Sequence, residues 1–247
     1  MTAIPRSMTA PIARHDDLFF GGMGLVIAVI VFLGFAPTFY LSSHFAGPPI
    51  SALRIVHGTV FTSWIVLFNV QVLLIARNRY GVHRALGVLG AILAAVMVPL
   101  GVTLAIVAAR AGLAPAGIPP LAFLAIPLFD MVVFASMVAA GIYFRRSADT
   151  HKRLMLLATL SLLAAAVFRL SRTLPIPPAL DAAGPLYFFG VVDLLVLVVA
   201  VYDLATRRRL HPATLWGGLL IVGSQALRLA VSGTHGWLAF ASMITGQ

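Results

Sequence analysis

Four charged side chains lie inside long apolar runs of this sequence. They are Asp130 in FDMVVF, Arg169 in VFRLS, Asp193 in VDLLVL and Arg228 in ALRLA. A charge in apolar surroundings is costly, so two acids and two bases are expected to neutralise one another or to serve a function. Arginine guanidinium groups bind carboxylate and phosphate groups, and a buried aspartate can exchange protons. We therefore take these residues as the first candidates for a site that binds a ligand or an ion.

Three further polar residues extend this candidate site. Arg54 and His57 lie near the start of one apolar run, in ALRIVHGTVF, and Gln225 precedes Arg228 by one helical turn. Buried Asp–Arg pairs also serve as structural links between helices. A ligand-binding pocket and a set of structural ion pairs therefore both stay open as interpretations.

Three other histidines suggest a second kind of chemistry. His83, His151 and His211 each lie close to basic residues at the start of an apolar run. Two imidazoles on facing helices could bind a haem iron from opposite sides, so a b-type haem or quinone-linked redox protein is the alternative function. The same histidines also suit helix ends at a membrane surface, and we predict no resident cofactor.

A metal-dependent intramembrane hydrolase is a third hypothesis. His57, Asp130 and Asp193 offer the histidine and carboxylate ligands that zinc takes. His57 is expected a turn or two away from the aspartates, however, and the sequence has no HExxH motif. We therefore predict no metal site.

Composition excludes several other classes of protein. The chain has no cysteine, which excludes disulfides, thiolate metal sites and cysteine nucleophiles. Its single lysine, Lys152, lies between two apolar runs, so no intramembrane amine is available to bind retinal. The net charge of +10 comes from short basic clusters between apolar runs, a pattern that argues against nucleic-acid binding.

The elements that must position these residues are membrane-spanning helices. Of the 247 residues, 61% are hydrophobic and 10% are charged, whereas about a quarter of a soluble domain is charged. Seven apolar runs are each close to the length of a span, which needs about 20 residues. They cover residues 18–41, 51–76, 85–109, 121–144, 154–170, 185–206 and 214–231. We predict an all-α, seven-helix transmembrane bundle over 18–247, preceded by a flexible cytoplasmic tail over 1–17.

The basic residues predict how the bundle is oriented. Twelve arginine and lysine residues fall in the tail and alternate connections, and about three fall in the others. Cytoplasmic loops carry the excess of basic residues. We therefore predict a cytoplasmic N-terminus, an outer C-terminus and a multi-pass protein whose partner is the lipid bilayer, with the oligomeric state left open.

Spacing within the chain suggests duplicated helix hairpins. Asp130, His151 and Arg169 are separated by 21 and 18 residues, and Asp193, His211 and Arg228 by 18 and 17. Counted along helices from the cytoplasmic ends, the four charged residues lie roughly 20–24 Å above the inner boundary. This common depth predicts one polar layer in the outer half of the membrane, facing an outward-opening cavity.

The segment from His57 to Gly87 resembles a pattern in uncharacterised bacterial multi-pass membrane proteins. A histidine, His57, opens one span, Gln71 lies near its inner end, and HRxxG, here His83, Arg84 and Gly87, opens the next. The resemblance covers about 30 of the 247 residues. It implies a bacterial cytoplasmic membrane and assigns no catalytic residue.

Together these observations favour a protein that binds or transports a small molecule or ion through Asp130, Asp193, Arg169, Arg228 and His57. The alternatives are the redox protein, the hydrolase and a passive assembly partner, and a non-enzymatic role is favoured.

Overall fold

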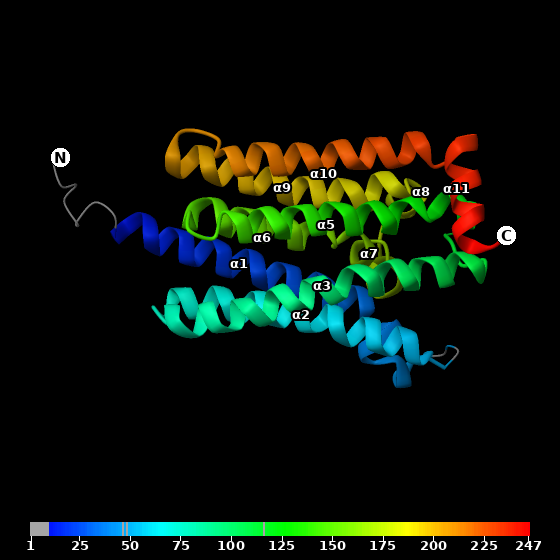
Figure 1. The fold of residues 1–247 in the computed structure, drawn as a ribbon, viewed down its shortest axis with the longest axis horizontal. Coiled ribbons are helices and arrows are strands. Elements are labelled where there is room, and N and C mark those ends of the chain that lie inside the picture. Colours follow the sequence, from blue (N-terminus) through cyan, green and yellow to red (C-terminus); the bar gives the residue numbers. More distant parts are fainter. Residues whose placement is uncertain (1–9, 46, 48, 116) are drawn as a thin grey trace.

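The computed structural model describes every residue except 1–9, 46, 48 and 116, and the described chain is a bundle of helices (Figure 1). Its long helices are α1 (Ala10–Phe35), α2 (Ala52–Ala76), α3 (Tyr80–Arg110), α5 (Ala125–Tyr143), α6 (Ala148–Ser161), α9 (Pro185–Arg207) and α10 (Pro212–Val231). Its shorter helices are η2 (Ala36–Tyr40), η3 (Ser42–His44), α4 (Pro120–Phe123), α7 (Ala164–Val167), η4 (Leu170–Arg172), α8 (Pro178–Ala182) and α11 (His235–Thr245). No strand occurs in the part of the chain that is described.

Seven segments of the described chain are long and apolar enough to cross a membrane, which confirms the predicted bundle. They are His15–Tyr40, Ala52–Ala76, Tyr80–Arg110, Pro120–Tyr143, Ala148–Val167, Pro185–Arg207 and Pro212–Val231. Exposed leucine, isoleucine and valine side chains cover the outside of the bundle. The protein therefore contacts the lipid bilayer along these helices.

The two ends of the bundle differ. Figure 1 shows the α2–α3, α5–α6 and α9–α10 connections at the end where α1 begins, and α11 at the other end. We call the first the basic end, because its connections carry the arginine clusters at 77–79, 145–146 and 207–209. The second is called the far end.

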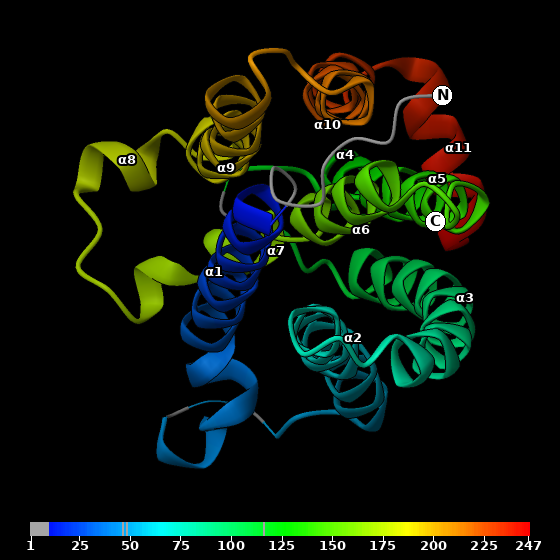
Figure 2. The same cartoon turned by 90° about the vertical axis from the view of Figure 1, so that its left-hand side faces the viewer.

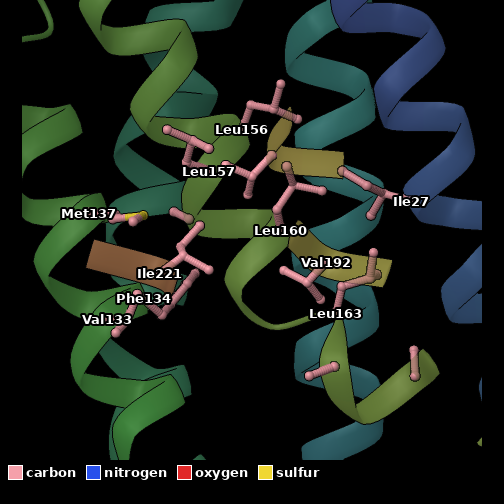
Figure 3. Close-up of a cluster of buried hydrophobic side chains, with 14 of the residues drawn as sticks. Ile27, Val133, Phe134, Met137, Leu156, Leu157, Leu160, Leu163, Val192 and Ile221 are labelled. Carbon is pink, nitrogen blue, oxygen red and sulfur yellow. The ribbon is translucent and has the colours of Figure 1, made fainter. Parts of the chain in front are cut away.

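Helices α5 and α6 form the centre of the bundle. In the two spans that contain them, 56% and 67% of the most apolar window is buried, against 17–39% in the other spans. Figure 2, viewed from the basic end, shows α1, α2, α3, α9 and α10 around this pair. Leucines on one face of α6 meet Ile27 of α1, Val192 of α9 and Ile221 of α10 in the main apolar core (Figure 3).

Several helix boundaries differ from the sequence-based expectation. Helix α1 begins at Ala10, so residues 10–17, which were expected in the flexible tail, form its first turns. The fifth span begins at Ala148 and is interrupted after Ser161, where α7 follows as a separate turn. Residues 1–9 of the predicted tail lie outside the described residues.

An unexpected helix, α11, closes the far end. Thr234 caps it by accepting a hydrogen bond from the Trp237 backbone N–H at 3.3 Å, and Gly246 ends it with a positive φ of 68°. The Trp237 indole donates to the Leu121 carbonyl at 2.8 Å, and the Arg110 guanidinium donates to the Ile244 carbonyl at 3.2 Å. These contacts hold α11 against the ends of α3 and α4.

Candidate functional site

Arg228 and Asp130 form a buried ion pair between α10 and α5. The Arg228 Nη1 atom donates to Asp130 Oδ1 and, at 3.3 Å, to the Ile126 carbonyl. Its Nη2 and Nε atoms donate to the Oγ atom and the carbonyl oxygen of Ser224 at 2.8 and 3.2 Å. Arg228 is 2% exposed and Asp130 is 7% exposed. Because the guanidinium already has four partners, it has little capacity left to bind a ligand.

Asp193 and Gln225 form a second polar pair close by. The Gln225 Nε2 atom donates to Asp193 Oδ1 at 2.9 Å, which links α10 to α9. A cavity of about 10 Å³ lies among Asp130, Ser161, Gln225 and Arg228. That volume suits about one water molecule and no organic ligand.

Arg169 lies apart from these two pairs. It follows α7, and its guanidinium lies 5.0 Å from the centre of the Phe35 ring of α1 and 5.9 Å from that of Phe168. It donates one hydrogen bond, from Nη1 to the Ala165 carbonyl at 2.7 Å. Among the described side chains no carboxylate forms an ion pair with it. Of the four charges expected in one layer, Asp130, Arg228 and Asp193 lie near one another, and Arg169 lies apart from them.

Two other arginines at the far end repel the positive charge of Arg169. Burial and the positive charges of Arg172 and Arg54 lower the pKa of Arg169 to about 10, so it still carries its charge at neutral pH. Arg54 lies in the first turn of α2, where the helix dipole favours negative charge. The described carboxylates form no ion pair with either residue.

His57 completes this group. Its ring stacks on Phe61 with the ring centres 4.0 Å apart, and Arg169 lies within electrostatic range. Its Nδ1 atom is buried and has no hydrogen-bond partner. We call Arg54, His57, Arg169 and Arg172 the far-end cluster. It combines several positive charges with a buried polar atom that lacks a partner.

Two of the three candidate haem histidines lie side by side, and the third lies apart from them. His83 of α3 and His151 of α6 lie side by side with ring centres 6.3 Å apart and planes at 89°. His211 instead caps α10, where its Nδ1 atom accepts a hydrogen bond from the Ala213 backbone N–H at 3.1 Å. Within the described residues, no group of three His, Cys, Asp or Glu side chains could hold a metal ion.

An ion-pair network at the basic end was not anticipated from the sequence. Arg153 and Asp203 pair with both side chains fully buried, and Asp203 also accepts from the Thr214 hydroxyl at 2.5 Å. Asp16 of α1 pairs with Lys152 at 2.6 Å and Arg207 at 3.1 Å. The sequence feature that pointed to this network is Asp203, which lies near the end of the apolar run 185–206. The basic residues near it predicted only the orientation of the bundle.

A second cavity faces outward from α2. It is open, measures about 470 Å³ and is lined by Phe39, Thr59, Thr62, Ser63, Val66, Leu67, Val70 and Leu86. Val66 and Val70 are among the exposed apolar residues, so this groove lies on the lipid-facing side of the bundle.

Comparison of the chain with protein-family models, with curated proteins and with solved structures finds no match.

Proposed function

We propose that the protein binds or transports a small anion, or a small molecule with an anionic group, and that the far-end cluster is the binding site. The observation that carries the proposal is Arg169, a charged residue in an apolar setting that has no carboxylate partner among the described side chains. An unpaired charge in apolar surroundings is costly and is usually kept for a function.

The geometry around Arg169 favours an anion over a cation. Its guanidinium lies over the Phe35 ring and donates one hydrogen bond to the protein, so donors remain for a bound group. Arginine donors are spaced to bind carboxylate or phosphate through two parallel hydrogen bonds. A bound anion would offset the repulsion between Arg169, Arg54 and Arg172, which no described carboxylate does.

For the Asp130–Arg228 pair we propose a structural role. Both charges are satisfied within the protein, and the adjoining cavity holds about one water molecule. If this pair is structural, the ligand site consists of the residues around Arg169 and does not include the whole predicted polar layer.

We further propose that the basic end faces the cytoplasm of a bacterial cell and that the far-end cluster faces outward. The arginine clusters at 77–79, 145–146 and 207–209 support this orientation, because cytoplasmic loops carry the excess of basic residues. The cluster would then meet its ligand from the outer side of the membrane.

The proposal is tested with inorganic phosphate and acetate as probes on the full chain purified in detergent. A ligand at 100 times its Kd stabilises a protein by about 2.7 kcal/mol, which a thermal unfolding curve detects. We expect phosphate or acetate to raise Tm at constant ionic strength, and Arg169→Gln to remove most of that rise.

Arg209→Gln is the matched control, because Arg209 is an exposed arginine at the basic end. It should leave the rise intact. The proposal is wrong if neither anion stabilises the wild-type chain, or if Arg209→Gln and Arg169→Gln weaken the effect equally.

A further inference from the structure

We propose that His83 and His151 bind one divalent transition-metal ion, of the class of Zn²⁺, Ni²⁺ or Cu²⁺, at the basic end of the bundle, with the Gln71 side-chain oxygen as a third ligand. This site lies at the opposite end from the far-end cluster and does not depend on the proposed anion binding. It draws one ligand from each of α2, α3 and α6.

The spacing of the two rings suits a shared ion. Zinc–nitrogen bonds of 2.0–2.1 Å place an ion about 3.2 Å from the centre of each imidazole ring, so two rings on one ion lie up to about 6.4 Å apart. The ring centres of His83 and His151 are 6.3 Å apart. A bent arrangement needs the rings to approach by about 1 Å, which side-chain rotation can supply.

A hydrogen bond to a backbone carbonyl orients the His151 ring, as is typical of metal-binding histidines. Its Nδ1 atom lies 2.8 Å from the Gly141 carbonyl oxygen of α5. A carbonyl oxygen only accepts, so Nδ1 carries the proton, and Nε2 of the neutral ring keeps its lone pair. Metal-ligating histidines typically donate their other ring N–H to such an acceptor, which fixes both tautomer and orientation.

Two buried polar atoms beside His83 lack partners. They are the His83 Nδ1 atom and the Gln71 Oε1 atom. The two residues are in contact, because Gln71 Nε2 donates to the His83 carbonyl at 3.1 Å. Buried polar atoms without a partner are rare, and a metal ion coordinated by both would satisfy them.

The ligand types select the class of ion. Imidazole nitrogen suits zinc, nickel and copper, whereas Ca²⁺ and Mg²⁺ take oxygen ligands almost throughout. Water would complete a four-coordinate site. Gly87 lies opposite the Gln71 amide, with 3.7 Å between its would-be Cβ and Nε2, so this position leaves room for that side chain.

The test uses the full chain carrying an affinity tag without histidine, stripped of metal and titrated with Zn²⁺ in a calorimeter. We expect one ion per chain, and a loss of affinity of at least about 10-fold in His83→Asn and in His151→Asn. His44→Asn, which changes an exposed histidine at the far end, is the control and should bind as the wild type does.

Cobalt provides a second measurement on the unmodified protein. Co²⁺ bound by the two imidazoles should give visible d–d absorption bands that Zn²⁺ displaces, which supports the site even where a variant fails to fold. Absence of these bands together with absence of Zn²⁺ binding would overturn the proposal. So would Zn²⁺ binding that survives His83→Asn/His151→Asn, or binding of added haem with a Soret band that either substitution abolishes.

Discussion

Three arginines of this protein show that the partners of a charged side chain determine whether it can bind a ligand. Arg153 and Arg228 each pair with an aspartate, Asp203 and Asp130, and their charges are neutralised inside the protein. Arg169 stacks on aromatic rings and has no such partner among the described side chains. The sequence places all three arginines near or inside apolar runs, but their pairing depends on which helices are neighbours. Only Arg169 is left with the capacity to bind an external anion.

Breaking the Asp130–Arg228 pair from one side should be strongly destabilising. Asp130→Asn leaves the Arg228 charge buried without its counter-charge, and losses of about 3–5 kcal/mol are typical of such changes. The double variant Asp130→Leu/Arg228→Met, which removes both charges, should be less destabilised than Asp130→Asn. Unfolding curves in detergent provide the comparison, and a structural role is contradicted if Asp130→Asn unfolds like the wild type.

His211 predicts a dependence of stability on pH. Burial and the positive charge of Arg153 lower its pKa, and its Nδ1 atom accepts a hydrogen bond and so carries no proton in the folded protein. The unfolded chain takes up a proton near its ordinary pKa of about 6.5, so the contribution of His211 to stability is present above that pH and is lost as the pH falls.

This prediction is tested by measuring Tm at pH 7.5 and at pH 5.5 for the wild type and for His211→Asn. Asparagine also caps helices but does not titrate in this range. We expect a smaller fall of Tm in the variant, and an equal fall in both proteins would show that His211 is not responsible.

At the scale of elements, the length of the apolar runs predicted the seven spans, and polar contacts lie near two of the helix boundaries that differ from the prediction. The early start of α1 coincides with Asp16, which Lys152 and Arg207 hold against α6 and α9. After the break between α6 and α7, Arg169 lies against Phe35 at the end of α1. Neither contact is visible in the periodicity of segments that are apolar on nearly all sides, so the sequence could not assign Arg169 to its site.

The approach of α1 to α7 gives a matched pair of glycine substitutions. A Cβ atom on Gly34 would lie 2.3 Å from the Ala166 carbonyl oxygen, whereas Gly21 has nothing within 4 Å. Gly34→Ala should force the helices apart and cost about 1–3 kcal/mol, as overpacking does. Gly21→Ala should be neutral or stabilise α1 by up to about 1 kcal/mol.

Thermal unfolding of the two glycine variants measures this difference. Because Phe35 covers Arg169 and follows Gly34 directly, Gly34→Ala should also weaken stabilisation by phosphate. Equal stability of the two variants would contradict the close contact of α1 with α7.

At the scale of the whole molecule, the distribution of charge divides the bundle into two ends. The basic end is closed by ion pairs between α1, α6 and α9, so most of its buried charges are matched. The far end holds arginines that no described carboxylate matches. The sequence could predict the number of spans and the ends to which the loops belong, but not this difference, because it depends on contacts between distant segments.

The predicted orientation can be tested because the chain has no cysteine. Ser147→Cys introduces a thiol at the basic end, and Gln247→Cys introduces one at the far end. A membrane-impermeant maleimide added to intact cells should label Gln247→Cys and leave Ser147→Cys unlabelled. The reverse pattern would place the arginine clusters outside and contradict the predicted orientation.

Anion binding at Arg169 can be observed by anomalous diffraction from crystals of the full chain soaked in selenate, a tetrahedral oxyanion. Binding at this residue requires an anomalous peak within hydrogen-bond distance of the Arg169 guanidinium, absent in Arg169→Gln and retained in Arg209→Gln. An empty far-end cluster, or peaks confined to the arginine loops of the basic end, would contradict it.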